Sequence, residues 1–311
     1  MKVNYILDTN IYRNLVRGKN IIDIQKKIIS KNQDNTIFPI IVAIELINNL
    51  LENKKTSLNC FLALYYLTNN QNNNFNNLFL PNIYSLLPLF LFKEISKKQE
   101  VFNRNIITLS YEITNKGDYK NVQKFNSEIL KVKQYKENEI NQIVENLKYY
   151  LKTINGNQDI NWNIFEENII LKREFEYLLK NDGLKEIFGL ALIKMSMEER
   201  KVKYVKMPEI LDNLLNNFSM SIDFFIEHIL TKLLTIRNKE YIYKPALDPK
   251  KRWNSFYDFQ LIMGFEYENH FGRKTIFVSE EKKIQTLFKK YEKENFFMNL
   301  DEYKRHLNLC N

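Results

Sequence analysis

The stretch NYILDTNIYRNLVRG, Asn4 to Gly18, decides the fold, because an apolar run stops there at an acidic residue and a helical pattern begins behind it. Residues 3–7 predict a buried strand, and apolar residues at helical spacing from Ile11 predict a helix. Asp8 therefore lies at a strand-to-helix corner. Two roles are open for Asp8. It is a helix cap, since Asp bonds free N–H groups at a helix start, or it belongs to an acidic site whose other members lie elsewhere in the chain.

A second corner of this kind follows in TIFPIIVAIELINNLL, residues 36–51. Thr36 to Phe38 predict a short strand, and the apolar positions from Ile40 onward mark one face of a helix. Glu45 lies in the middle of this helix in an almost wholly apolar setting. Because an unpaired carboxylate is costly to bury, Glu45 needs a partner.

The C-terminal part of the chain returns to the same alternation. A helix is predicted to begin near Asp258, and Thr275 to Val278 predict a strand that ends in Ser279-Glu280-Glu281. Another amphipathic helix follows from about Ile284. The two ends of the chain therefore share one architecture, which predicts the α/β class with a parallel sheet.

The middle of the chain is helical in pattern from about residue 85 to 240. One long amphipathic helix is predicted from about 125 to Asn155-Gly156, a second from about 162 to 183, and two more from near Pro208 and Ser221. The simplest topology is an α/β domain, residues 1–60 plus 246–311, interrupted by an all-helical insertion, residues 91–245. Residues 61–90 are left unassigned.

Four carboxylates stand out by position. Asp8 and Glu281 each follow a strand, and ligands gather at the carboxyl ends of parallel strands. Glu45 and Asp258 each lie on a helix among apolar neighbours. If the four converge, their mutual repulsion demands protons or cations. Oxygen-only ligands suit Mg²⁺ or Mn²⁺, which lowers the pKa of a bound water and stabilises a leaving oxygen in phosphodiester hydrolysis.

This pattern resembles the PIN domain family of metal-dependent nucleases. The resemblance runs through LDTN at residues 7–10, IVAIEL with Glu45, SFYDFQLIMGF with Asp258 and IFVSEEKKI with Glu281. It implies an α/β/α sandwich with a central parallel sheet that binds Mg²⁺ or Mn²⁺ and cleaves RNA.

The resemblance also implies roles for single residues. Asp8, Glu45 and Asp258 match the three usual acidic positions, and Asn10 becomes a polar or substrate contact. The fourth position lies in a Thr-x-Asp motif, to which Ser279 and Glu281 are aligned, with Glu280 as the alternative fourth acid. Glu in place of Asp adds a methylene and shifts the carboxylate.

Basic residues near these positions are candidate contacts for nucleic acid. The chain carries 46 Lys and Arg against 37 Asp and Glu, a net charge of +9, which favours an anionic partner. Arg13 and Arg17 follow Asp8 one helical turn apart and are placed to reach a phosphate. Lys251 and Arg252 precede Asp258. Arg13 and Arg17 are equally compatible with a solvated helix face.

Several other classes find no support in the sequence. There is no long apolar segment, so no membrane association is expected and the protein is expected in the cytoplasm. Two cysteines far apart imply neither a zinc site nor a disulfide framework. Nucleotide-binding glycine loops and the GxSxG and HExxH motifs are missing.

The functional expectation is a PIN-type endoribonuclease acting as a bacterial toxin or defence effector. A structure-specific DNA nuclease and a catalytically inactive module that binds RNA or protein are the alternatives. An inhibitory protein partner and a homo-oligomer stay open.

Overall fold

The computed structural model describes residues 3–29, 35–70, 79–154, 170, 173, 177, 183–200, 206–231 and 254–309. The chain forms two compact units. Unit 1 comprises Met1–Leu86, Lys97–Lys133 and Gln260–Asn311, and unit 2 comprises Leu87–Ser96 and Gln134–Phe259. Each unit is built from segments that are far apart in the sequence.

Unit 1 contains two parallel sheets. The larger sheet has the order β2-β1-β5-β6 and the smaller one pairs β3 with β4. The strands are β1 (Asn4–Leu7), β2 (Asn35–Thr36), β3 (Phe38–Pro39), β4 (Phe79–Leu80), β5 (Thr275–Val278) and β6 (Phe297–Met298). Strands of unit 1 pair in parallel and alternate with helices along the chain, so the fold belongs to the α/β class.

The strands predicted at 3–7 and 275–278 are confirmed as β1 and β5. Their residues are buried on both faces, as is usual for the central strands of a parallel sheet. The single strand predicted at Thr36 to Phe38 is wrong in its extent. Ile37 donates its N–H to the carbonyl of Tyr5 at 2.9 Å, and the chain then turns from β2 in one sheet to β3 in the other.

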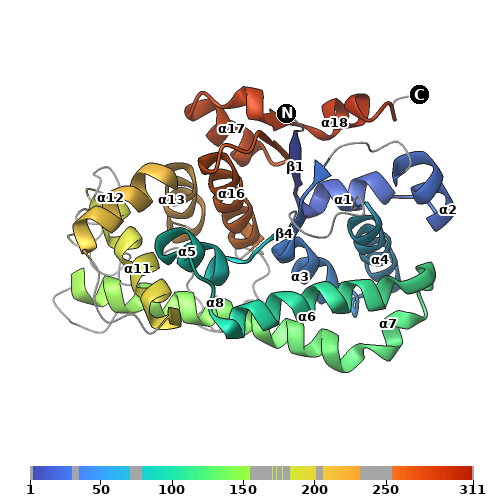
Figure 1. Ribbon diagram of the computed structural model, residues 1–311, viewed down its shortest axis with the longest axis horizontal. Helices are drawn as coiled ribbons and strands as arrows, with labels where there is room; N and C mark the ends of the chain where they lie inside the picture. Colours follow the sequence, from blue (N-terminus) through green and yellow to red (C-terminus); the bar gives the residue numbers. More distant parts are fainter. Residues whose placement is uncertain are drawn as a thin grey trace. The chain divides into compact units, whose positions relative to one another are not determined.

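Helices of unit 1 cover these strands. Tyr12 on α1 packs against Tyr66 on α4 with ring centroids 5.6 Å apart, and Figure 1 shows α1, α3 and α4 side by side. Phe265 on α16 (Ser255–His270) packs against Phe277 of β5 and Phe288 of α17. The helices and turns are α1 (Thr9–Val16), α2 (Ile21–Asp23), η1 (Ile24–Ile28), α3 (Ile40–Asn48), α4 (Lys54–Asn69), α6 (Lys97–Thr114), η3 (Asn115–Gly117), α7 (Asn121–Lys124), α17 (Lys282–Lys290), η7 (Glu294–Phe296) and α18 (Leu300–His306).

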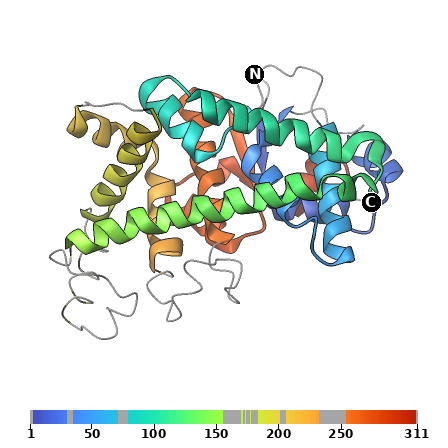
Figure 2. The ribbon, with the colours of Figure 1, turned by 90° about the horizontal axis from the view of Figure 1, so that it is seen from below.

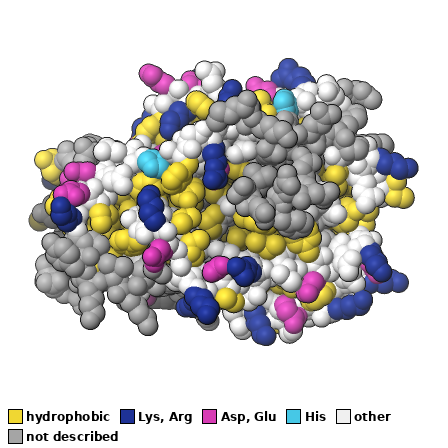
Figure 3. Space-filling model, viewed as in Figure 1, with side chains coloured by type: hydrophobic (Ala, Val, Ile, Leu, Met, Phe, Trp, Pro, Cys, Tyr) yellow, Lys and Arg dark blue, Asp and Glu magenta, His cyan; other side chains and the backbone are white. Residues whose placement is uncertain are grey.

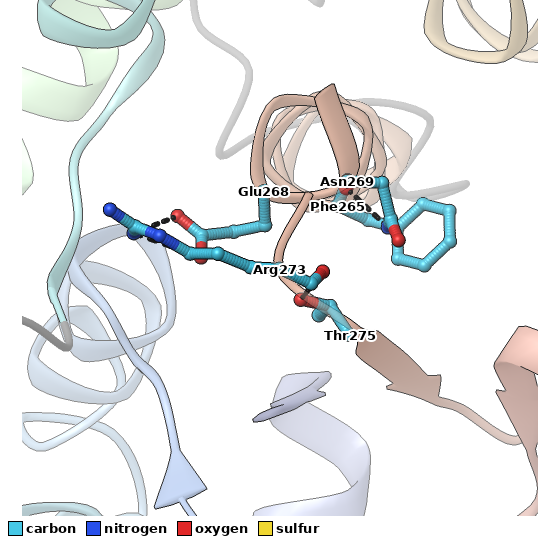
Figure 4. A network of polar contacts seen from close by, with 5 residues as sticks. All are labelled: Phe265, Glu268, Asn269, Arg273 and Thr275. Carbon is cyan, nitrogen blue, oxygen red and sulfur yellow. Dashed lines mark hydrogen bonds and ion pairs between the residues drawn. The ribbon is translucent and has the colours of Figure 1, made fainter. Parts of the chain in front are cut away.

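The turn from α16 (Ser255–His270) into β5 is fixed by an ion pair. Arg273 donates from Nη1 to both carboxylate oxygens of Glu268, at 3.1 and 3.2 Å, as Figure 4 shows. Burial raises the pKa of the Glu268 carboxyl above its usual value, and the Arg273 charge offsets only part of this rise. Gly272 allows the turn, because its φ of +69° lies in the left-handed region. Thr275 closes the turn by donating its hydroxyl to the carbonyl of Arg273.

Unit 2 is helical over the residues that the structure describes. Its core includes Phe188 stacked on Phe225 with ring centroids 3.9 Å apart, and Phe90 packed edge-on against Phe218. Its helices are α11 (Gly183–Arg200), α12 (Met207–Asn217), α13 (Ser219–Phe225) and η4 (Ile226–Leu230). Three further helices run from one unit into the other, namely α5 (Ile83–Phe92), α8 (Asn126–Ile154) and α16.

The long helix predicted from about 125 is confirmed as α8, which is followed as a single ribbon in Figure 2. The helices predicted near Pro208 and Ser221 are confirmed as α12 and α13. The helix predicted from 162 to 183 falls almost entirely outside the described residues. Residues 97–133, assigned from the sequence to the helical insertion, cluster with unit 1. Among the described helices, none combines the length and apolar character needed to cross a membrane.

Candidate functional site

Asp8 and Ser279 lie next to each other at the carboxyl edge of the larger sheet. The parallel register pairs Leu7 with Val278, the last residues of β1 and β5. Backbone hydrogen bonds continue one residue further, because Asp8 donates its N–H to the carbonyl of Val278 at 3.1 Å. The strands therefore bring together two residues that are 271 positions apart in the sequence.

The Asp8 carboxylate is held on both of its oxygens. Oδ1 accepts the N–H of Ile11 at 2.9 Å, which makes Asp8 the N-cap of α1. Oδ2 accepts the hydroxyl of Ser279. Asp8 is only 2% exposed and Ser279 is fully buried. The cap role considered in the sequence analysis is thus confirmed, and one oxygen of the same carboxylate faces the end of β5.

Thr9 connects the start of α1 to the middle of α3. Its hydroxyl donates to Oε2 of Glu45 at 2.5 Å, and Thr9 is 5% exposed. Glu45 itself is half-buried on α3. Thr9, the residue that directly follows Asp8, is therefore a polar partner of Glu45.

Asn10, the next residue along α1, is bonded to Glu281. Its side-chain amide donates to Oε1 of Glu281 at 3.2 Å, and the backbone N–H of Glu281 donates to the hydroxyl of Ser279 at 3.1 Å. Glu280 is directed elsewhere, because its Oε1 accepts the N–H of Leu300 at the start of α18 at 2.8 Å. Of the two adjacent glutamates, Glu281 is the one bonded to the start of α1.

Three consecutive residues after β1 thus gather three acidic groups. Asp8 is one of them, Thr9 holds Glu45 and Asn10 holds Glu281. All three carboxylates belong to unit 1.

Arg13 and Glu45 act on a common neighbour, the Cys60 thiol of α4. Burial is the main reason that the pKa of Cys60 is raised to about 11, while the Arg13 charge lowers it and the Glu45 charge raises it. The charges of Arg13 and Glu45 therefore both act on the same buried residue of α4.

The remaining site residues are placed as follows. Asp258 is half-buried on α16, in the part of that helix that belongs to unit 2, and its approach to the other carboxylates stays a prediction. Lys251 and Arg252 lie outside the described residues. Arg13 and Arg17 line a cavity together with Lys19 and Lys55, two residues that the sequence analysis did not select.

The site offers the kind of ligand atom that a divalent metal prefers, but too few such ligands lie close together in the structure. Carboxylate oxygens are the ligands that Mg²⁺ and Mn²⁺ prefer. Among the residues that the structure describes, no three or more His, Cys, Asp or Glu side chains approach closely enough to hold a metal ion. The short links through Thr9 and Asn10 bring the acids to one region without closing them into a ligand shell. Metal binding therefore stays a prediction.

Asn48 is a further polar residue of α3 that sequence reasoning missed. It follows Glu45 by three residues, which places both on the same side of α3. Both of its side-chain amide atoms are buried without a hydrogen-bond partner among the described residues. A buried amide of this kind normally bonds water or a ligand. From the sequence, Asn48 was one Asn among many in a chain rich in Asn.

Comparison of the chain with protein-family models, with curated proteins and with solved structures finds no match.

Proposed function

We propose that this protein is a metal-dependent nuclease that hydrolyses phosphodiester bonds of RNA at the carboxyl edge of the β1–β5 sheet. The observation that carries the proposal is the arrangement of Asp8, Thr9 and Asn10, which gathers two further carboxylates, Glu45 and Glu281, around one strand end. A PIN-like α/β/α sandwich is the arrangement proposed for the catalytic part of the chain.

In this proposal Asp8, Glu45 and Glu281 would come closer together than they lie in the structure in order to hold the ion. The bound ion would supply positive charge and an activated water for phosphodiester hydrolysis. The rest of the chemistry is orientation. Ser279 and the Ile11 N–H fix both oxygens of Asp8, and Thr9 fixes one oxygen of Glu45. Side chains held by such partners lose little freedom when they bind a ligand.

RNA is the proposed substrate, as the resemblance to the PIN family implies, and the same acidic edge suits a DNA phosphodiester. Asp258 is the proposed fourth acid, on the same resemblance. A role as a toxin or defence effector belongs to the same proposal, and expression toxicity that disappears in Asp8→Asn would support it.

A second candidate function is a module that binds nucleic acid without cutting it. Two observations favour it. Both oxygens of Asp8 are already bonded within the protein, and the described acids do not form a group of three at metal-binding distance. In such a module the acidic residues would be structural, holding α1 and α3 to the strand ends.

The test is a cleavage assay on labelled single-stranded RNA and on DNA of the same sequence. The protein is incubated with Mn²⁺ or Mg²⁺, and in parallel with a chelator. We expect cleavage of RNA that the chelator abolishes and that Asp8→Asn reduces by about 100-fold or more, which corresponds to ~3 kcal/mol of transition-state stabilisation. Asp258→Asn tests the fourth acid in the same way.

Asp212→Asn is the matched control. Asp212 is an exposed acid on α12, so this substitution makes the same chemical change as Asp8→Asn but outside the site. It is expected to cleave like the unmodified protein. Binding without metal-dependent cleavage in any protein tested would contradict the nuclease and support the binding module.

A further inference from the structure

A cavity of about 510 Å³ opens in unit 1 between the C-terminal end of α1 and the first turns of α4. The two helices pack directly on each other, as Figure 1 shows. Its lining includes Arg13, Arg17, Lys19 and Lys55.

The charge of this lining is of one sign. It contains two arginines and two lysines but no Asp or Glu. None of the four cations forms an ion pair with a carboxylate of the residues that the structure describes. On the face drawn in Figure 3, the described Lys and Arg side chains lie among acidic, hydrophobic and other side chains. Four cations around one hollow favour an anion, because each lowers the free energy of a negative charge placed there.

The other walls suit a phosphate that carries an organic group. Thr56 and Asn59 provide neutral hydrogen-bonding side chains. Lys55 and Thr56 lie in the first turn of α4, a helix of 16 residues, whose N-terminal dipole adds to the attraction for an anion. Leu58 is 41% exposed, and with Leu62 it offers an apolar wall to a sugar or base.

The position of the cavity along α1 relates it to the acidic site. At a rise of about 1.5 Å per residue, Arg13 lies roughly 8 Å and Arg17 roughly 14 Å from Asp8 along the axis of α1. A nucleic-acid strand that reaches Asp8 with one phosphodiester therefore has neighbouring phosphates within range of this cavity.

We propose that this cavity binds a backbone phosphate of a nucleic-acid strand whose scissile phosphodiester lies at Asp8. The second half of this statement rests on the proposed nuclease function, whereas the phosphate site stands on its own lining. Arg13 and Arg17 provide charge from α1 and its C-cap, Lys19 from the residues that follow, and Lys55 from the first turn of α4. Phosphate contacts of this kind position a strand without reading its sequence.

The test is fluorescence anisotropy with a labelled 12-nucleotide single-stranded RNA in the presence of a chelator, so that binding is measured without cleavage. Arg17→Gln and Lys55→Gln are the test variants, because both side chains reach the surface and neither is needed for the core. Lys289→Gln, an exposed lysine of α17, is the matched control with the same loss of charge.

We expect each test variant to weaken RNA binding by roughly tenfold and the control to leave it unchanged. The slope of log affinity against log salt should fall by about 0.7 for each phosphate contact removed, as single strands require. Competition by inorganic phosphate or by adenosine monophosphate would show whether the free anion alone occupies the site.

Equal affinity of all variants would overturn the proposal. It would also be overturned if the variants lost affinity for an acidic peptide such as poly-glutamate while keeping their affinity for RNA. Failure of the nuclease function is seen separately. If no protein cleaves RNA but Arg17→Gln and Lys55→Gln bind it more weakly, the phosphate site holds. If the unmodified protein cleaves and these variants bind and cleave as well as it does, only the phosphate site is wrong.

Discussion

Asp8 is the helix cap that the sequence offered as one of two roles, and its membership of an acidic metal site stays a prediction. One oxygen caps α1 through the Ile11 N–H, and the other accepts the Ser279 hydroxyl at the end of β5. The corner between strand and helix could be predicted from the sequence, because Asp follows an apolar run and precedes a helical pattern. The identity of the second partner could not be predicted from local pattern, since Ser279 reaches Asp8 only through the pairing of β1 with β5.

Ser279 is expected to act as a positioning residue for Asp8. Ser279→Ala removes the hydroxyl that orients Oδ2, and we expect RNA cleavage at saturating substrate to fall by about 10- to 100-fold, the usual effect of losing such a partner. Ser279→Thr keeps the hydroxyl and should restore cleavage to within a few-fold of the unmodified protein. The account is contradicted if the alanine variant cleaves normally, or if threonine rescues nothing while both variants remain folded by circular dichroism.

At the scale of elements, the strands and helices with strong periodic patterns were predictable and the shortest ones were not. The strands β1 and β5 and the helices α3, α8 and α17 follow from apolar runs and helical spacing. The strands β4 and β6 have two residues each, too few to show any period. The sequence analysis left most of α4 unassigned, although Asn53 caps its first turn, because its buried residues from Cys60 to Thr68 form a continuous run without a polar face.

Contact between α16 and β4 can be tested at Gly264. A Cβ added there would lie 2.2 Å from Cδ2 of Leu80, a residue only 1% exposed. We expect Gly264→Ala to lower the free energy of unfolding by about 1–2 kcal/mol, because overpacking exceeds the gain in helix propensity. Leu80→Ala alone should cost about 2–5 kcal/mol.

The double variant should cost less than the sum of the two, because removal of the Leu80 side chain makes room for the new methyl group. Urea unfolding of the four proteins measures this coupling. Strict additivity would show that α16 and β4 do not contact each other as described.

The turn between α16 and β5 predicts a dependence on pH. Glu268 is buried and its pKa is raised, so its stabilising contribution is full below its unfolded pKa, near 4.5, and declines as pH rises through the folded value. Arg273→Gln removes the charge that opposes this rise. We expect a loss of about 1–3 kcal/mol near pH 7.5 and a smaller loss near pH 5, measured by urea unfolding.

Arg104→Gln is the control for this prediction. Arg104 pairs with Glu100 on α6, but both side chains are at least half exposed, so the variant should cost about 0–1 kcal/mol at either pH. A loss in Arg273→Gln that is equal at both pH values would show that Glu268 does not carry the effect.

At the scale of the whole molecule, the sequence predicted that the two chain ends build one α/β unit, and β1 from one end of the chain pairs with β5 from the other. The sequence did not indicate that residues 97–133 cluster with that unit, because α6 has the same helical pattern as the helices of unit 2. Its assignment depends on packing against α3 and α4, which are distant in sequence. The net charge of +9 likewise did not indicate where on the molecule an anion would bind, whereas the cavity beside α1 does.

The central claim is that acids held by the start of α1 bind a metal ion that drives RNA cleavage. Glu280 and Glu281 offer the most direct test, because these neighbours are chemically identical, yet only Glu281 is bonded to Asn10 while Glu280 is bonded to the Leu300 N–H. The measurement is the rate of RNA cleavage as a function of Mn²⁺ concentration in the unmodified protein, Glu281→Gln and Glu280→Gln. The account predicts that Glu281→Gln raises the half-saturating Mn²⁺ concentration by about tenfold or more and that Glu280→Gln leaves it unchanged. Cleavage that does not depend on Mn²⁺, or the same shift in both variants, would contradict it.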